Sequence, residues 1–409
     1  MNTTTSRIGY LEALASAACL RETLPAELLP FFDVSFIRSH LLYGEFVYRL
    51  VLQVVREIGL DVAMRDPGSA EDITDRAKLE PLRAVIPLDW MLRCLVGRGV
   101  LEELSSGAAA YRYRVRGPLP DLDPAPVREE QRRYEPSWMP AYVLAETAAR
   151  EYPAFLRGEV TGEDVLFSAR RLRLWIDYFS NDNGLYAVNN RVGAVAVARW
   201  LPRSGATLVE LGGGLGSGAL AVLERLEAGG RLAAIAEYRF TELVAAFLRR
   251  GEQTLRTRYP TLGCLTFAPI DMNHSFEEQS VAPGSVSVVY AVNTLHVARD
   301  LHFTLREVFQ ALEPGGRLVI SECVRPHPRQ PIPAEFVFNL TETFRSPRLH
   351  PVHRPSGGFL TPEQWKGVIE SAGFVDLRVL PDIVGLRDRV PDLSVAAIGA
   401  SRPGLTPAR

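Results

Sequence analysis

A glycine-rich stretch has residue types and spacing that could carry chemistry. Residues 207–218 read TLVELGGGLGSG, a β-branched and leucine run with one acid that continues into five glycines. This pattern predicts a strand, a tight turn and a helix that begins near Ala219. Glycine permits positive φ and close approach of a ligand, and the free N–H groups of a helix start favour polar or anionic groups. We therefore expect a nucleotide-like ligand on Gly212, Gly214 and Gly216.

The spacing of the glycines indicates which nucleotide is bound. A dinucleotide fingerprint needs G-x-G-x-x-G, but its third position falls on Ser217. The order E-x-G-x-G-x-G from Glu210 to Gly216 instead resembles the first motif of class I methyltransferases that use S-adenosyl-L-methionine (SAM) and release S-adenosyl-L-homocysteine. The resemblance implies that the turn accommodates the methionine end of SAM, with Glu210 near its amino group. A plain tight turn is the alternative interpretation.

The same resemblance implies further cofactor contacts after the next two predicted strands. The acid that accepts the ribose hydroxyls is either Glu237, which is nearer the usual spacing, or Glu242. We favour Glu242, because FTELVAAFL at 240–248 resembles the family's stretch in which the acid precedes a helix containing A-F-L. Asp271, in APIDM, matches the acid that contacts the adenine amino group, and Met272 would stack nearby. A surface turn is the alternative for Asp271.

A histidine and an acid follow two predicted strands farther along the chain. Residues 285–322 read SVSVVYAVNTLHVARDLHFTLREVFQALEPGGRLVISE. This stretch resembles the C-methyltransferase domains of polyketide synthases, which read N-x-L-H-A-x-R-D-L, a helix, K-P-G-G and a strand ending in an acid. The implied catalytic dyad is His296 with Glu322, 26 positions apart; Val297 and Glu313 depart from the pattern. The histidine position also resembles the catalytic base of plant-type O-methyltransferases.

Elementary chemistry agrees with the implied dyad. Both residues follow the ends of neighbouring strands, and a carboxylate that holds one imidazole nitrogen leaves the other to take a proton. Deprotonation of an acidic α-carbon or a phenol at neutral pH needs such a base. A lone histidine is more often structural, but the strand-end position and the paired acid favour catalysis. Asn293 would lie alongside SAM or the substrate.

Candidate substrate contacts flank these motifs. Tyr178, Tyr186 and Asn190 precede the glycine turn and line its pocket in one interpretation, or cap and pack helices in the other. Phe338 lies in AEFVFNLTETF, at the place where the family covers its active site. We expect no metal: His350 and His353 are three apart, but Pro351 spoils a helical ligand pair and no carboxylate lies close in sequence.

Composition excludes several classes of partner. The net charge of −2 requires no basic face for nucleic acid or for a membrane surface, and no run reaches the ~20 apolar residues of a membrane span. The opening segment LEALASAACL is a poor signal peptide. The four cysteines form no C-x-x-C pair, so neither disulfides nor zinc are indicated, and a cytoplasmic location fits.

Alternating strands and helices from residue 207 predict an α/β fold, the Rossmann-like seven-stranded sheet of class I methyltransferases. A mostly helical, winged-helix-like domain precedes it. We expect residues 1–116 to form this N-terminal domain, 117–205 a linker and helical lid, and 206–402 the SAM-binding catalytic domain. An apolar rather than basic third helix in residues 86–101 argues against DNA binding. The resemblance to small-molecule O-methyltransferases implies a homodimer platform.

The sequence therefore predicts a SAM-dependent methyltransferase that acts on a small molecule in secondary metabolism. C-methylation is favoured. The alternatives are O-methylation, another SAM reaction on the same fold, and a SAM-binding regulatory protein.

Overall fold

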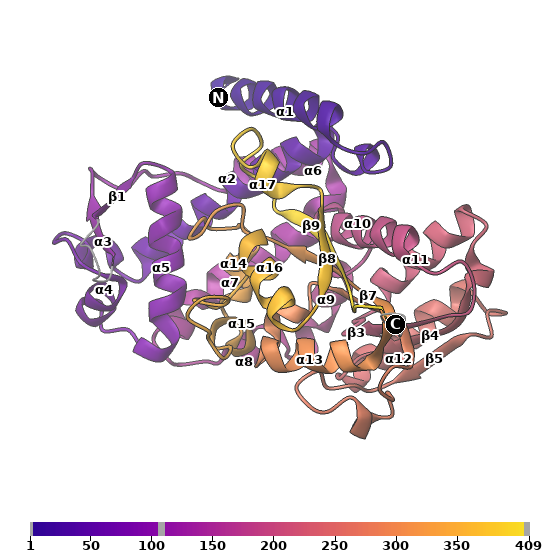
Figure 1. The fold of residues 1–409 in the computed structure, drawn as a ribbon. Coiled ribbons are helices and arrows are strands. Elements are labelled where there is room, and N and C mark those ends of the chain that lie inside the picture. The colour runs from indigo at the N-terminus through magenta and orange to yellow at the C-terminus, as the bar shows by residue number, and fades with distance from the viewer. Residues whose placement is uncertain (1–2, 105–110, 405–409) are drawn as a thin grey trace. The chain divides into compact units, whose positions relative to one another are not determined.

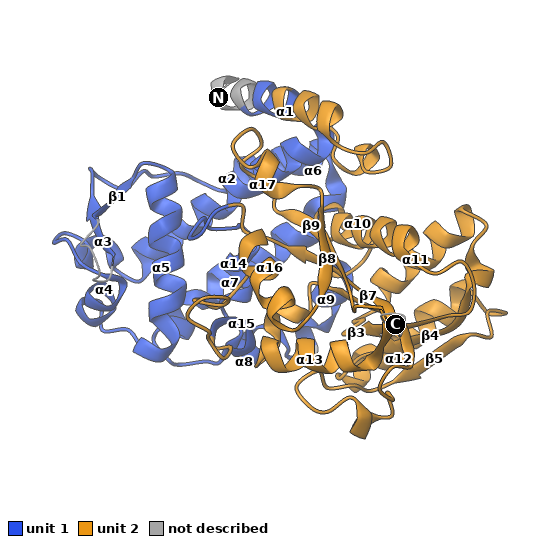
Figure 2. Ribbon diagram, in the orientation of Figure 1, with its two compact units in different colours: residues 1–14, 34–178, 327–345 blue, residues 15–33, 179–326, 346–409 orange. Residues whose placement is uncertain are grey.

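The computed structural model describes residues 3–104 and 111–404, which divide into two compact units (Figure 1). Unit 1 comprises residues 1–14, 34–178 and 327–345, and unit 2 comprises residues 15–33, 179–326 and 346–409 (Figure 2). Helix α1 (Thr3–Thr23) contributes residues to both. The domain boundaries at residues 117 and 206 stay a prediction. No helix in the described ranges is long and apolar enough to cross a bilayer.

Unit 1 is mostly helical and contains one small antiparallel sheet, β1 with β2, that directly follows α5. This is the order of helices and hairpin expected from the sequence. Its elements are α2 (Val34–Glu57), α3 (Leu60–Ala63), α4 (Ala70–Arg76), α5 (Pro81–Gly97), β1 (Leu101–Leu104), β2 (Arg112–Val115), α6 (Ala125–Tyr134), η2 (Pro136–Trp138), α7 (Met139–Leu156), α8 (Gly162–Leu166), η3 (Ala169–Arg171), α9 (Leu172–Tyr178), α14 (Glu335–Phe338) and α15 (Glu342–Arg345).

Prolines among charged residues at 117–140, the start of the predicted linker and lid, favour a plain linker, but α6 and η2 lie within this segment. Proline in the first turn of α6 suits a helix start. Glu129 then pairs with Arg132 and Arg133 one turn farther on, at 2.8 and 2.7 Å. Gln131 is buried, where its amide donates to Ser39 and to a backbone carbonyl. Local pairing and one buried anchor therefore make this segment helical.

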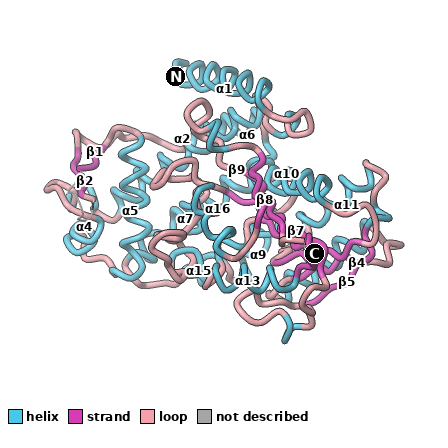
Figure 3. The backbone as a smooth tube through the Cα atoms, viewed as in Figure 1, coloured by secondary structure: helices cyan, strands magenta, loops and turns pink. Residues whose placement is uncertain are grey.

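Unit 2 is built on the predicted seven-stranded sheet, in the order β5-β4-β3-β6-β7-β9-β8. Figure 3 draws the strands in magenta. Its first five strands are parallel, and β9 runs antiparallel to both β7 and β8. The α/β fold expected from the sequence is thus confirmed. The strands are β3 (Ala206–Leu211), β4 (Ile235–Thr241), β5 (Leu265–Ala268), β6 (Val286–Val292), β7 (Leu312–Cys323), β8 (Val375–Leu380) and β9 (Val395–Ser401).

Helices pack on this sheet and bury it. Every residue of β6 and β9 is buried, as expected for strands covered on both faces. Helix α10 packs on β6, β7 and β9, whereas α13 packs on β7 and on α16. The helices are η1 (Leu29–Phe31), α10 (Gly184–Trp200), α11 (Ser217–Ala228), η4 (Leu232–Ala234), α12 (Ala245–Arg258), η5 (Glu277–Gln279), η6 (Leu295–Val297), α13 (Leu301–Ala311), α16 (Pro362–Ser371) and α17 (Ile383–Leu386).

Because β3, β4, β5, β6 and β7 are parallel, their carboxyl ends lie at one edge of the sheet, which is where α/β folds place their ligand sites. The segments that follow these strands carry most of the residues singled out by the sequence.

Candidate active site

The glycine turn joins the end of β3 to the start of α11, with positive φ at Gly212, Gly214 and Gly216 of 61°, 58° and 90°. A Cβ atom on Gly212 would lie 2.5 Å from the side chain of Thr294, so that position has no room for one. A Cβ atom on Gly214 would meet no described atom within 4 Å. Gly214 therefore faces open space, where a ligand can lie against the backbone.

Glu210 lies beneath the turn and is almost fully buried. The Tyr238 hydroxyl donates to its Oε2 at 3.0 Å. A Cβ atom on Gly218 would lie 2.7 Å from Glu210 Oε1 and 3.7 Å from Asn190 Oδ1, so both oxygens border the same small space. Burial raises the pKa of Glu210 to about 8, against the smaller effect of the Tyr238 hydrogen bond.

Asn190 supplies an acceptor that needs a partner. Its amide donates to Asn181 at 2.8 Å, but its Oδ1 is buried without a hydrogen bond among the described residues. Leaving a buried polar atom unsatisfied is costly. A positively charged amino group beside Gly218 would satisfy Asn190 Oδ1 and ionise Glu210 at once. These two oxygens therefore fit the ammonium group of a SAM methionine end.

The two acids considered for the ribose lie in different places. Glu242 directly follows β4 and accepts hydrogen bonds from the N–H groups of Gly214 at 3.0 Å and Val244 at 2.8 Å. Burial raises the pKa of the Glu242 carboxyl, and these N–H groups oppose it. Glu237 lies inside β4, where it pairs with Arg239 and accepts from Thr266. Glu242, not Glu237, therefore borders the glycine turn.

Asp271 follows β5 and is held in a turn of its own. Its carboxylate accepts from the backbone and side-chain N–H groups of Asn273 at 2.9 and 3.0 Å and contacts His274 Nδ1 at 3.1 Å. Partial burial acts to raise the pKa of Asp271, but these hydrogen bonds outweigh it and the pKa is lowered. The carbonyl of Met272 accepts from Thr304. An ionised carboxylate still has lone pairs for an adenine amino group.

His296 and Glu322 are brought together by the sheet. His296 lies in η6, after β6, and its Nδ1 is 2.7 Å from Glu322 Oε2, near the end of β7. The second oxygen, Oε1, accepts from the backbone N–H groups of Thr294 at 3.2 Å and Leu295 at 3.1 Å. Glu322 is fully buried and His296 is 4% exposed. A carboxylate that accepts from Nδ1–H leaves Nε2 as the basic nitrogen of a neutral imidazole.

Two residues that the sequence did not single out complete the surroundings of His296. The guanidinium of Arg354 is buried and donates to the carbonyls of His296 and Ala298. Burial lowers the pKa of Arg354 to about 10, while Glu322 acts to raise it. The ring of Phe359 packs 4.7 Å from the His296 imidazole, centroid to centroid. Both lie more than 55 positions from His296 in sequence, so no local motif could have predicted that they contact it.

The remaining candidates lie in both units. Asn293, at the end of β6, accepts from the N–H of Cys323 at 2.8 Å through its side chain, which ties the ends of β6 and β7 together. Tyr186 packs on Phe179 in unit 2, with ring centroids 5.0 Å apart. Tyr178 and Phe338 belong to unit 1, where their rings lie 6.1 Å apart beside that of Trp175.

Comparison with known proteins identifies the fold and its chemistry. Residues 209–318 match the family described as a methyltransferase domain. The chain therefore contains a SAM-dependent methyltransferase domain. Highly reducing polyketide synthase 2 of Gibberella zeae is 30% identical over 197 residues, 46% of this chain and 7% of the synthase. Polyketide synthase PksM of Bacillus subtilis is 26% identical over 274 residues, 64% of this chain and 6% of the synthase.

This methyltransferase therefore spans less than a tenth of the length of these two synthases. Among solved structures, the CurJ carbon methyltransferase aligns with a TM-score of 0.72 and 21% identity, over 89% of this chain and 92% of that one. An identity this low shows a shared fold. The alignment extends well beyond the matched family, into the helical N-terminal region.

We predict opposite effects of Glu210→Gln on SAM affinity and on stability. Affinity should fall about 10- to 100-fold, since a hydrogen bond to a charged group contributes ~1.5–3 kcal/mol. Burial raises the pKa of Glu210 from 4.5 to about 8, so the contribution of this carboxyl to the stability of the SAM-free protein is lost as pH rises through that range. Glutamine escapes this loss, and the variant should melt at a higher temperature than the wild type at pH 9.

Calorimetric titration with SAM and thermal melts at pH 4.5 and pH 9 test both effects. Glu237→Gln is the matched control, because Glu237 lies away from the turn, and it should bind SAM as the wild type does. An unchanged SAM affinity in Glu210→Gln would contradict the assigned position of the amino group.

Proposed function

We propose that this methyltransferase transfers the methyl group of SAM to an acidic carbon atom of a small molecule of polyketide type, with His296 as general base. The observation that carries the proposal is the 2.7 Å contact between His296 Nδ1 and a fully buried Glu322 at the edge of the sheet that also bears the glycine turn. The relatives are polyketide synthases and the fold neighbour is a carbon methyltransferase, which supports carbon over oxygen as the acceptor.

The cofactor site consists of residues from four consecutive strand ends. Bound SAM supplies an electrophilic methyl group. Glu210 binds the amino group, Glu242 accepts hydrogen bonds from the ribose hydroxyls, and Asp271 contacts the adenine. The glycine turn offers backbone N–H groups and lets the ligand lie against the chain. The residues proposed for this site are Glu210, Gly212, Gly214, Gly216, Glu242, Asp271, Met272 and Asn293.

The dyad would generate the nucleophile. His296 Nε2 takes a proton from a carbon that a neighbouring carbonyl has made acidic, and Glu322 both holds the imidazole and stabilises the imidazolium that forms. Two backbone N–H groups on Glu322 Oε1 fix the carboxylate, so the imidazole is positioned before the substrate arrives. Tyr186 in unit 2 is a proposed substrate contact, whereas Asn190, which the sequence also suggested for the substrate, is assigned to the amino group of SAM. Tyr178 and Phe338 of unit 1 stay predictions from the sequence.

O-methylation is the second candidate, because the same base could deprotonate a phenol. A regulatory DNA-binding role has less support. Helix α5 buries Leu88, Met91, Leu92 and Leu95 inside unit 1, so the apolar stripe of the would-be recognition helix is used for packing. Arg93 on the same helix pairs with Asp89 at 2.8 Å.

The product decides between carbon and oxygen. We expect methyl-labelled SAM and a panel of β-dicarbonyl compounds, 2-oxo acids and phenols to give a product labelled on the carbon between two carbonyls. Mass spectrometry with fragment analysis locates the label. Label confined to phenolic oxygen would replace carbon with oxygen in the proposal, and the absence of any methyl transfer by protein that binds SAM would contradict it.

For the dyad, we predict that His296→Ala lowers turnover ~10²- to 10⁴-fold, the usual contribution of general base catalysis, with SAM affinity nearly intact. Glu322→Gln should lose less, because the imidazole remains. The losses should not add in the double variant, since the residues act as one unit. Steady-state kinetics and SAM titrations measure both, with His40→Gln in unit 1 as control. Wild-type turnover in His296→Ala would show that methyl transfer needs no base.

We also propose that residues 1–116 form a homodimer and do not bind DNA. Leu82, at the start of α5, is 86% exposed and Ile86 is 42% exposed, which leaves apolar surface on this helix for a second copy. Light scattering on the full chain should give twice the mass of one chain, and Leu82→Glu with Ile86→Glu should give a monomer. A monomeric wild type at micromolar concentration, or a salt-sensitive gel shift with duplex DNA, would contradict the proposal.

A further inference from the structure

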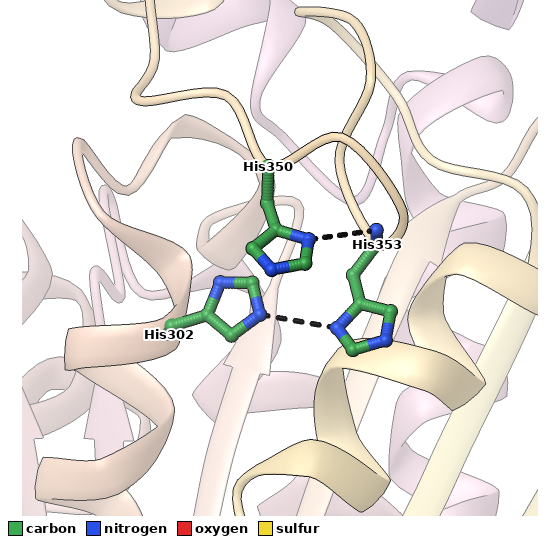
Figure 4. Close-up of side chains that lie close together, drawn as sticks. All are labelled: His302, His350 and His353. Carbon is green, nitrogen blue, oxygen red and sulfur yellow. Dashed lines mark hydrogen bonds between the residues drawn. The ribbon is translucent and has the colours of Figure 1, made fainter.

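Three histidines in unit 2 converge on one point outside the proposed catalytic dyad (Figure 4). His302 lies in the first turn of α13, and His350 and His353 lie in the turn that leads to Arg354. One nitrogen from each imidazole lies within 4.8 Å of the other two. From the sequence, only His350 and His353 were weighed as a pair of metal ligands. The third histidine, His302, lies 48 positions earlier in the chain than His350.

The arrangement of His302 and His353 matches that of two metal ligands. Their nitrogens, Nε2 and Nδ1, are 3.2 Å apart. Two nitrogens bound to one tetrahedral zinc ion at 2.0–2.1 Å would be separated by about 3.3 Å. In Figure 4 the three rings face one another, with His350 placed above the gap between the other two. The ring centroids of His302 and His353 lie 4.7 and 4.7 Å from that of His350.

We propose that His302, His350 and His353 bind one divalent transition-metal ion of the zinc type. The ligand set is three imidazoles without a carboxylate, which suits Zn²⁺, Co²⁺, Ni²⁺ or Cu²⁺ and not Mg²⁺ or Ca²⁺, whose preferred ligands are oxygens. Each histidine is only partly buried, so an ion can reach the site and a water molecule can complete a tetrahedron.

Binding requires defined proton positions. His302 Nε2 and His353 Nδ1 share one proton in their hydrogen bond. For both nitrogens to bind the ion, this proton must move to the other nitrogen of the ring that carries it, and both rings stay neutral. His350 Nδ1 accepts from the N–H groups of Val352 at 3.3 Å and His353 at 3.1 Å. Its neutral ring therefore carries the proton on Nε2. Binding through either nitrogen therefore breaks these two long hydrogen bonds: either the ion takes the lone pair of Nδ1, or the proton moves to Nδ1 so that Nε2 can bind.

The position of the site gives the ion a structural task. His350 and Arg354 exchange two backbone hydrogen bonds, each 2.9 Å long, so the turn is closed directly beside the buried arginine. Arg354 in turn contacts the carbonyl of His296. An ion would join α13 to this turn and so hold Arg354 in place. It would take no part in methyl transfer, and the proposal is independent of the acceptor atom.

The test uses the full chain, freed of any affinity tag and dialysed against a chelator and then buffer. Titration with Co²⁺ should give one equivalent bound, with the visible absorption of a tetrahedral complex, and Zn²⁺ should displace it and raise the melting temperature. His302→Gln and His353→Gln should each weaken binding by more than the ~10- to 100-fold that loss of an outer-shell partner costs, because a direct ligand is removed. His327→Gln, a histidine outside the cluster, is the matched control.

Circular dichroism identifies variants that fold, and if either substitution unfolds the chain, the other one and His350→Gln decide. Equal metal affinity in the wild type and in the folded cluster variants would place the ion elsewhere and overturn the proposal. The same conclusion would follow if the wild type bound less than stoichiometric Co²⁺ at micromolar concentration, which would leave the three imidazoles as a hydrogen-bonded cluster only.

Discussion

The edge of the sheet that carries the proposed site depends on the burial of one carboxylate. Glu322 has no exposed surface, and a buried charge is tolerated only where hydrogen bonds and opposite charges replace water. Oε2 accepts a hydrogen bond from the His296 imidazole, and Oε1 accepts from the N–H groups of Thr294 and Leu295. All three donors come from the segment that follows β6. The hydrogen bonds to Glu322 therefore fix both the path of this segment and the orientation of the His296 imidazole.

The same segment links His296 to the glycine turn. Thr294, whose N–H contacts Glu322, also donates from its hydroxyl to the carbonyl of Gly212 at 3.3 Å, and its methyl group occupies the space that a Cβ at Gly212 would need. One residue thus contacts both the turn after β3 and the acid on β7. The pairing of β6 with both strands brings these segments together. The proposed SAM site and the proposed base are therefore parts of one packed unit rather than two separate motifs.

Much of this edge was predictable because its signals are local. Apolar strands and a glycine turn identify the sheet, and the positions of His296 and Glu322 after two strands predict their meeting. The choice of Glu242 over Glu237 for the ribose stays a prediction. The structure places Glu242 directly after β4, the position that the FTELVAAFL stretch rather than strand spacing indicated. The proline-rich segment 117–140 was misjudged because proline at a helix start resembles proline in a linker.

The sequence could not reveal contacts made across the fold. Arg354 and Phe359 reach His296 from a segment that joins β7 to α16, and His302 meets His350 and His353 from another helix. Nothing in residue type or local spacing marks these pairs. Asn190 was predicted only as a polar residue near the turn. The feature that points to a cationic group is its unsatisfied Oδ1, and only the folded chain shows that no donor lies within reach of this atom among the described residues.

The charge on Glu322 serves the fold as well as the proposed reaction. Arg354 is buried, and its pKa of about 10 keeps it protonated at neutral pH, so this edge contains a buried cation beside a buried anion. Glu322 is the largest of the charges that raise the pKa of Arg354 against its burial. Removing the carboxylate would leave the guanidinium without its main counter-charge, a costly state in a low-dielectric interior. A neutral residue at position 322 therefore affects His296 in two ways. It removes the carboxylate that contacts Nδ1, and it removes the main counter-charge of Arg354, which donates to the His296 carbonyl.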